Sequence, residues 1–136
     1  MKAIWCPRDS GSACAAAHTE RAIVSQCEAT DARAIFPCFD EPDLKATLRW
    51  TVRTDPKLTV VTNGVPDTSS KKGGRVVHKF KRTRIIPTYL AALTIGDLDA
   101  TKSVKISNIP TRVLCGRGKL GQTGFAEEVT AHVLPW

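Results

Sequence analysis

The residues best suited to chemistry lie in one acidic stretch, QCEATDARAIFPCFDEP, which covers residues 26–42. Its carboxylates surround a single base, whereas the chain as a whole carries a formal net charge of +7. The acids are Glu28, Asp31, Asp40 and Glu41, with Asp43 just past the end of the stretch, and the base is Arg33. Carboxylates in a partly desolvated cleft bind cations through charge-assisted hydrogen bonds. Composition alone, however, favours the simpler interpretation of a solvated acidic loop.

The acidic stretch has neither helical nor strand periodicity over its whole length. Its prolines, small residues and aromatics favour an ordered loop with one turn of helix. Binding groups are commonly found on ordered loops that a rigid scaffold holds in place. The elements on either side of the stretch must therefore supply that scaffold.

Segments with strand patterns flank the stretch and predict an antiparallel β domain. The clearest covers residues 44–54, where apolar and polar residues alternate as in a half-exposed antiparallel sheet. Residues 58–62 are rich in β-branched side chains, and residues 89–95, apolar on both faces, are expected to form a central strand. Further short strands are expected over residues 20–25, 75–83, 102–106 and 111–115.

The remaining segments are expected to connect these strands or to follow them. Asn63-Gly64 is a turn signal, and the polar residues 65–74 predict a mobile loop. Near the carboxyl terminus, apolar residues at i, i+4, i+7 and i+8 predict a helix with Thr123 as its N-cap. These residues are Phe125, Val129, His132 and Val133. The expected domains are a loosely ordered leader over 1–19, an antiparallel β domain over 20–116, and a linker with the start of a helix over 117–136.

The totals exclude several classes of protein. With 136 residues, 42% hydrophobic and 24% charged, the chain has the size and composition of one globular domain and not of a disordered protein. No apolar run approaches the ~20 residues that cross a bilayer, so no membrane partner is expected. Five cysteines without paired spacing favour thiols in a reducing compartment, and we expect a cytoplasmic protein.

The acidic stretch and its continuation, QCEATDARAIFPCFDEPDLKATLRWTV, resemble the amino-terminal domain of the aminopeptidase N family of zinc metallopeptidases, which includes puromycin-sensitive aminopeptidase. Three further pieces match in the same order: LTVVTNG, IPTYLAALTIGDLD and TRVLCGRGKLGQTGFAEEVTAHVLP. The match runs from about residue 25 to the end of the chain. The resemblance implies an antiparallel, saddle-like β-sheet or sandwich domain that leans on a zinc-bearing catalytic domain.

The resemblance also implies a role for Gln26 and Glu28. In the family, the glutamine and the acid of a Q-x-E motif face the active site, and these two residues match them. Residues at i and i+2 of an extended segment point to the same side. Glu28 would bind the free α-ammonium group of a peptide and reject blocked amino termini, because a buried acid left unpaired is costly. The amide of Gln26 would contact the peptide backbone or a carboxylate. The other acids are expected in caps, in turns and as partners of Arg33.

The zinc motif of the family does not occur in these 136 residues. The family binds zinc through H-E-x-x-H, whose two histidines share a helix face. His18, His78 and His132 lack that spacing, and the family's G-A-M-E-N motif is absent too. We therefore expect no catalytic residue, metal or cofactor in this chain, and zinc only in a full-length parent enzyme. The chain would be a fragment that is inactive alone, and its uncovered sheet edges would favour self-association.

Two other functions are consistent with the residues. The segment KKGGRVVHKFKRTR, residues 71–84, holds seven bases and no acid, which would suit a basic β module that binds nucleic acid or other anions. Its only aromatic is Phe80 and it contains no nucleic-acid motif, so a solvated hairpin is the commoner explanation and a nucleic-acid partner is not expected. The other alternative is a non-catalytic interaction protein that pairs with a separate catalytic chain.

Overall fold

The computed structural model describes residues 22–136, which form two compact units. The first unit extends to Gly96, and the second runs from Asp97 to Trp136. The leader predicted over residues 1–19 lies outside the described residues. The division predicted at residue 116, between the β domain and a linker, stays a prediction.

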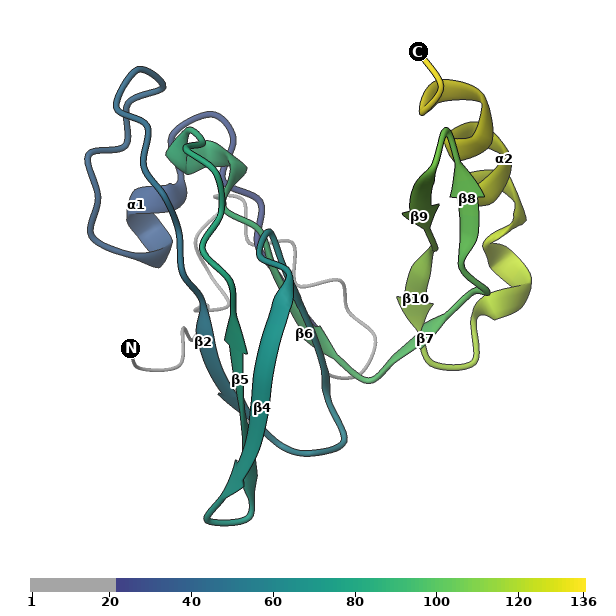
Figure 1. Cartoon of the computed structure of the whole chain (residues 1–136), viewed down its shortest axis with the longest axis horizontal. Coiled ribbons are helices and arrows are strands. Elements are labelled where there is room, and N and C mark those ends of the chain that lie inside the picture. The colour runs from purple at the N-terminus through teal and green to yellow at the C-terminus, as the bar shows by residue number, and fades with distance from the viewer. Residues whose placement is uncertain (1–21) are drawn as a thin grey trace. The chain divides into compact units, whose positions relative to one another are not determined.

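The acidic stretch directly follows the first strand of an antiparallel sheet in the first unit (Figure 1). In spatial order its described strands are β1 (Ile23–Val24), β6 (Leu93–Gly96) and β3 (Thr59–Thr62). β6 is therefore central, as predicted for residues 89–95, but it begins later than predicted. Pro87, with a φ of −61°, precedes a 3₁₀ turn, η1 (Thr88–Leu90), and this turn takes the first residues of the expected strand.

A second antiparallel sheet consists of β2 (Thr51–Thr54), β5 (Arg75–Phe80) and β4 (Pro66–Lys72), in that spatial order among the described residues. The predicted alternation is confirmed over residues 50–54, where Trp50, Val52 and Thr54 are buried while the residues between them are exposed, but Ala46, on the predicted apolar face, is exposed. The regular ladder is shorter than predicted. Before β2, residues 44–50 contribute one isolated bridge, from Ala46 to Ile86.

The mobile loop predicted over residues 65–74 is wrong, because residues 66–72 form β4 and pair with β5. Gly73 and Gly74 close this hairpin with φ of +56° and +72°. Tight hairpin turns need such positive φ values, and glycine adopts them without steric cost. Every residue of β4 is exposed, so its sequence shows no apolar period from which a strand could be predicted.

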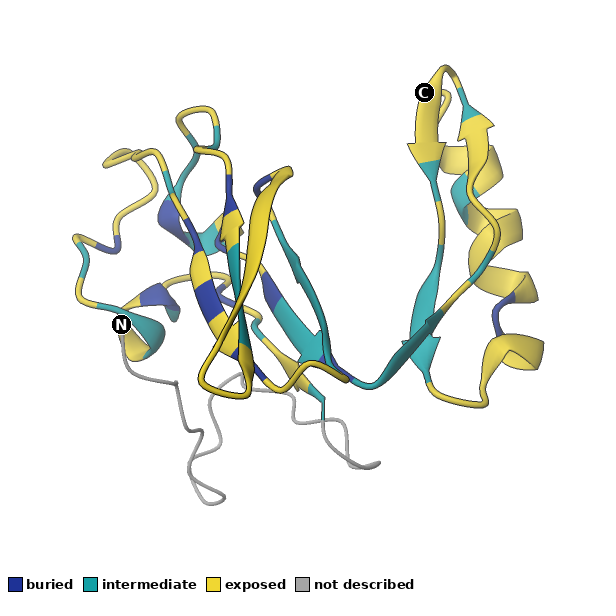
Figure 2. Cartoon of the chain, turned by 60° about the horizontal axis from the view of Figure 1, so that its bottom comes forward, coloured by how far each residue is buried: buried dark blue, intermediate teal, exposed yellow. Residues whose placement is uncertain are grey.

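The two sheets of the first unit share one hydrophobic core (Figure 2). Its buried side chains come from both sheets, from the segment before β6 and from the acidic stretch: Cys27, Ala32, Trp50, Val52, Phe80, Ala91 and Leu93. Half-buried residues of β3, β6 and the short helix α1 (Ala32–Ile35) pack against them. The acidic stretch is therefore attached to the core at Cys27 and Ala32, and it is not simply a solvated loop.

The second unit contains two pairs of short antiparallel strands. β7 (Leu98–Ala100) pairs with β10 (Leu114–Gly116), and β8 (Val104–Ile106) pairs with β9 (Ile109–Thr111). The strand predicted at 102–106 is confirmed as β8, whereas the one predicted at 111–115 is divided between β9 and β10. β7 was not predicted, because three residues are too few to show a period.

The helix predicted near the carboxyl terminus is confirmed as α2 (Gly124–Val133), which follows a 3₁₀ turn, η2 (Leu120–Gln122). Thr123 lies at the predicted N-cap position, but its hydroxyl donates to the Leu120 carbonyl and caps no N–H group of the helix. The apolar face of α2 is uncovered by the described residues: Phe125 is 79% exposed and Val133 is 64% exposed.

Residues 22–136 thus form a mainly β structure of antiparallel sheets with one short carboxyl-terminal helix, as predicted. None of the helices in this part of the chain is both long enough and apolar enough to span a membrane.

Candidate functional site

Gln26 and Glu28 lie in a short segment that hydrogen bonds hold against the chain before β6. The Ser25 hydroxyl donates to the Ala91 carbonyl at 3.1 Å. The Cys27 thiol, in a residue that is 1% exposed, donates to the same carbonyl at 3.4 Å. Residues 25 and 27 therefore point inward, and Glu28 begins the turn over residues 28–31 that the bond from the Asp31 N–H to the Cys27 carbonyl closes.

The outward side chains are those of Gln26 and Glu28, and both residues are exposed on either side of the buried Cys27. Within residues 22–136, neither side chain has a hydrogen-bond or ion-pair partner. The segment thus presents one amide and one carboxylate to solvent from a backbone that the core holds in place.

Asn63 holds the chain before β6, to which the segment of Gln26 and Glu28 is bonded. Its side-chain amide donates to the Leu90 carbonyl at 2.9 Å and accepts from the Ala92 N–H at 2.7 Å. A Cβ at Gly64 would lie 2.6 Å from the Lys81 carbonyl oxygen, so a larger residue would force the backbone to shift. The Asn-Gly pair, which indicated a turn, therefore also fixes the segment that holds the candidate site.

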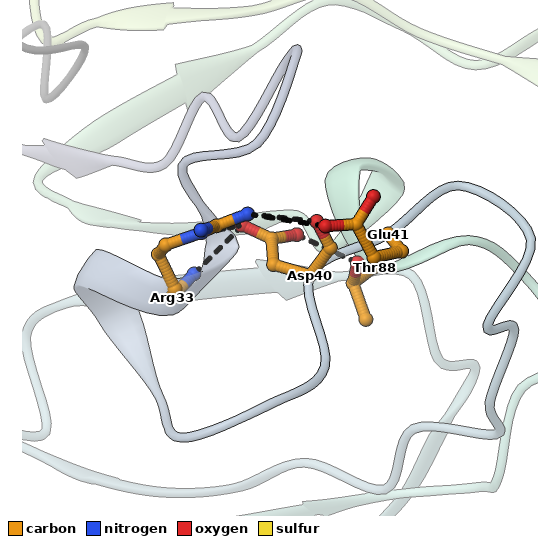
Figure 3. Close-up of polar contacts among 4 residues, drawn as sticks. All are labelled: Arg33, Asp40, Glu41 and Thr88. Atoms are coloured by element: carbon orange, nitrogen blue, oxygen red, sulfur yellow. Dashed lines mark hydrogen bonds and ion pairs between the residues drawn. The ribbon is translucent and has the colours of Figure 1, made fainter.

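A second group of contacts orders the rest of the acidic stretch around Asp40 (Figure 3). One carboxylate oxygen of Asp40 accepts from the Arg33 backbone N–H at 3.0 Å and from Arg33 Nε at 3.3 Å. The other oxygen accepts from the Thr88 hydroxyl at 2.7 Å, which joins the stretch to η1, 48 residues further along the chain. Because the Asp40 side chain is 1% exposed, these donors replace the water that its charge would otherwise bind.

These contacts also determine the charge state of the network. Burial by itself would raise the pKa of Asp40, but the hydrogen bonds from Thr88 and Arg33 and the charge of Arg33 outweigh it and hold that pKa below its ordinary value. Burial raises the pKa of the neighbouring Cys38 thiol, and the charge of Asp40 adds to the rise. At neutral pH, Asp40 is therefore ionised and Cys38 is a neutral thiol.

Two further acids of the stretch have the structural positions that were predicted. Glu41 lies 3.9 Å from the Arg33 guanidinium at the surface, where such a pair contributes little to stability. Asp31 occupies the N-cap position of α1, although its side chain makes no hydrogen bond to that helix. Arg33 thus pairs with Asp40 and Glu41 and leaves Glu28 outside the network.

A hollow of about 390 Å³ lies at the end of the acidic stretch. Its lining is largely apolar and consists of Phe36, Pro37, Cys38, Phe39, Leu44, Lys45, Ala46, Leu48 and Thr88. Phe39 is 82% exposed and Leu44 is 53% exposed. The Asp40 network is therefore bordered by apolar surface that the described residues do not cover.

Residues 15–90, more than half of the chain, match the family model of the Peptidase M1 N-terminal domain. The chain belongs to the M1 peptidase family. The M1 relatives include Aminopeptidase 2, mitochondrial, of Saccharomyces cerevisiae, which is 39% identical over 116 residues, or 85% of this chain and 12% of the relative. Leucyl aminopeptidase of Saccharolobus solfataricus is 37% identical over 101 residues, or 70% of this chain and 13% of the relative. The chain thus spans about an eighth of the length of the curated relatives it matches.

The M1 assignment confirms the resemblance drawn from the acidic stretch, and it raises the question of zinc. Among residues 22–136, no group of three or more His, Cys, Asp or Glu side chains could hold a metal ion. The two described histidines belong to different units: His78 is in β5 of the first unit, with its Nδ1 3.1 Å from the Ser69 hydroxyl, and His132 is in α2 of the second. The described part of this M1 domain does not fit a zinc site, and it supports no reaction step through one.

The M1 domain holds its candidate site through residues that the sequence did not single out. Ser25, Asn63 and Thr88 each bond to a part of the chain at least 27 residues away. Ser25 and Thr88 are ordinary surface residue types that carry no signal, and Asn63-Gly64 indicated a turn but not these long-range bonds. Asn63 and Thr88 do lie inside the matched pieces LTVVTNG and IPTYLAALTIGDLD, and that position is the one sequence feature that could have indicated them.

Proposed function

We propose that this M1 amino-terminal domain holds the free α-amino end of a peptide substrate of an aminopeptidase through Gln26 and Glu28. The observation that carries the proposal is the segment around Cys27. Hydrogen bonds fix its backbone to the core, while the two outward side chains are exposed and have no partner among residues 22–136. A carboxylate on a fixed backbone loses less conformational entropy on binding than one on a mobile loop.

In this proposal Glu28 supplies the charge and Gln26 the orientation. An ammonium group donates short, charge-assisted hydrogen bonds to a carboxylate. When a second domain covers the segment, a blocked amino terminus leaves the carboxylate of Glu28 without a partner, and an unsatisfied buried group costs about 1–3 kcal/mol or more. The amide of Gln26 both donates and accepts, so it can pair with the backbone of the first peptide bond.

The catalytic step belongs, in the same proposal, to a separate domain or chain that carries the zinc site. The relatives are named as aminopeptidases, and the matched region makes up only 12–13% of their length. The domain would work in the cytoplasm as the part of such an enzyme that binds the substrate. The 136-residue chain alone should therefore release no amino acid from a fluorogenic aminoacyl amide. Chelator-sensitive release by the purified chain would contradict this.

The role of Glu28 is testable in a chimera in which the aligned 116 residues of this chain replace those of Saccharomyces cerevisiae Aminopeptidase 2. Glu28→Gln should lower kcat/KM about 10- to 100-fold, because a hydrogen bond to a charged group is worth roughly 1.5–3 kcal/mol. Asp43→Asn removes another exposed acid just past the same stretch and is the matched control. An equal loss of kcat/KM in the two variants, or no loss in Glu28→Gln, would overturn the proposal.

Uncovered apolar surface supports a second part of the proposal, that the domain associates with a catalytic domain or with itself. Phe39 and Ile85 are 82% and 69% exposed, and β4 is an edge strand whose residues are all exposed. Sheet edges and exposed apolar patches are common sites of association. Size-exclusion chromatography of the chain should show self-association. A single monomeric species with a sharp, cooperative melting transition would count against this part.

A further inference from the structure

The outer face of the sheet β2–β5–β4 collects basic side chains from all three strands. On β2 and the two residues before it, Trp50, Val52 and Thr54 are buried, so the alternate positions 49, 51 and 53 point outward. Residues directly opposite one another in a ladder share a face, and Thr51 pairs with Lys79 of β5. The same rule places the remaining bases, and the basic face consists of Arg49, Arg53, Lys72, Arg75 and Lys79.

Each base of this face is a near neighbour of another base on the same face. Lys79 lies opposite Thr51 and is therefore a diagonal neighbour of both Arg49 and Arg53, at a spacing of roughly 7–8 Å. Arg53 lies opposite Val77, so Arg75 is its diagonal neighbour, and Lys72 lies directly opposite Arg75. The five charges thus form a continuous zigzag across the sheet.

The guanidinium of Arg53 extends this row to the hairpin turn. A Cβ at Gly73 would lie 3.4 Å from Arg53 Nη2. At the other end of the row, Arg49 and Lys79 line a hollow of about 390 Å³ together with the hydroxyls of Thr51 and Thr68. Guanidinium, ammonium and hydroxyl groups are the side-chain donors that bind phosphate oxygens.

The charges of the basic face are not used within the described fold. None of its five bases forms an ion pair with an acid in residues 22–136. Asp67, which also lines the hollow, makes no such pair either. By contrast, only three of the seven bases in the continuous run 71–84 lie on this face: Lys71 is on the other face of the sheet, and Lys81, Arg82 and Arg84 follow the end of β5. Arg49 and Arg53 come from outside that run. The continuous run in the sequence therefore contains only three of the five bases of the basic face.

We propose that the basic face binds the phosphate backbone of nucleic acid without regard to base sequence. A sheet face with five neighbouring cations suits a polymer that repeats an anion along its backbone, and phosphate contacts carry no sequence information. The face bears no exposed aromatic side chain for base stacking and no large exposed apolar side chain that would enter a bilayer. This inference does not depend on the proposed role of Glu28.

The test measures binding of the 136-residue chain to a fluorescein-labelled 20-base-pair DNA duplex by anisotropy between 50 and 200 mM salt. The triple variant Arg49→Gln, Arg53→Gln, Lys79→Gln should lose most of the affinity. Its plot of log K against log salt should flatten by about 0.9 for each phosphate that the variant no longer neutralises. The control Lys45→Gln, Lys57→Gln, Lys71→Gln removes the same number of charges from exposed residues off the basic face and should bind like the wild type. Glu28→Gln should also bind like the wild type.

Circular dichroism of both triple variants checks that the substitutions leave the fold intact. Three results would overturn the proposal: an equal loss of affinity in the two triple variants, no binding by the wild type at 150 mM salt, or equal affinity for vesicles that contain phosphatidylserine. The first would show an effect of net charge alone, and the last would show a surface for anionic lipids. A preference for one DNA sequence over a scrambled one would contradict binding through the phosphate backbone.

Discussion

The two charged regions of the first unit use their charges in opposite ways. In the acidic stretch, Asp40 is buried and its carboxylate accepts hydrogen bonds from Arg33 and Thr88. On the basic face, Arg49, Arg53 and Lys79 are exposed and form no ion pair within residues 22–136. A charge that the fold satisfies contributes to stability, whereas a charge that it leaves exposed is available to a ligand. Glu28 lies in the acidic stretch, but like the bases of the basic face it is exposed and has no ion-pair partner among residues 22–136.

Replacement of Asp40 should have the largest effect on stability. In Asp40→Asn, the remaining oxygen can still accept from Arg33, but the buried negative charge that pairs with the Arg33 guanidinium is lost, and so is the oxygen that accepts from Thr88. We expect the largest fall in Tm of any substitution considered for these two regions. Asp67→Asn, at an exposed position on β4, should leave Tm unchanged. Equal melting temperatures for Asp40→Asn and the wild type, by differential scanning calorimetry, would refute a structural role for the network.

The Asp40 network also predicts a dependence of stability on pH. The pKa of Asp40 is lower in the folded chain than the value of about 3.9 expected when it is unfolded. Its contribution is therefore fully present above pH ~4 and is lost as the pH falls through the folded pKa. Urea unfolding between pH 5 and 2 should show a smaller loss of stability for Asp40→Asn than for the wild type. Parallel curves for the two proteins would contradict the lowered pKa.

A smaller effect is expected when one donor to Asp40 is removed. Thr88→Val keeps the shape of a residue that is 4% exposed but deletes the hydroxyl that donates to Asp40 at 2.7 Å. The free energy of unfolding should fall by about 1–3 kcal/mol, because the carboxylate loses a buried hydrogen bond. Thr68→Val, the matched change on exposed β4, should stay within about 0.5 kcal/mol of the wild type. A similar loss at both positions would remove the distinction between the regions.

The smallest effect on stability should come from the basic face. Lys79→Gln removes an exposed charge with no ion-pair partner in the described chain, so the free energy of unfolding should change by less than about 0.5 kcal/mol. The same variant should weaken binding to duplex DNA. Destabilisation by more than about 1 kcal/mol in urea unfolding would show that the fold uses this charge after all.

The contrast between these regions also explains what could be predicted from the sequence. The strand β2 could be predicted because apolar residues recur at every second position up to Val52, and the last two of them, Trp50 and Val52, are buried on one face. β4 could not, because all its residues are exposed and its pairing partner alone determines its conformation. The helix α2 could be predicted from its apolar period, although the described residues leave its apolar face uncovered.

The candidate site was predicted to the same limited degree. The spacing of Gln26 and Glu28 and the family resemblance indicated which residues to consider. The hydrogen bonds that hold them could not be predicted, because the Ser25 hydroxyl bonds 66 residues away and Asn63 bonds 27 residues away. Long-range hydrogen bonds of single polar residues leave no periodic pattern in a sequence.

The central claim, that Glu28 binds the α-amino group of a peptide, is tested most directly by a double-mutant cycle in the chimera described above. Inhibition constants are measured for a peptide inhibitor with and without its α-amino group, against the wild-type chimera and Glu28→Gln. We expect a coupling free energy of about 1.5–3 kcal/mol, so that loss of the amino group matters only when Glu28 is present. Additive effects, within about 0.5 kcal/mol, would show that Glu28 and the amino group do not interact.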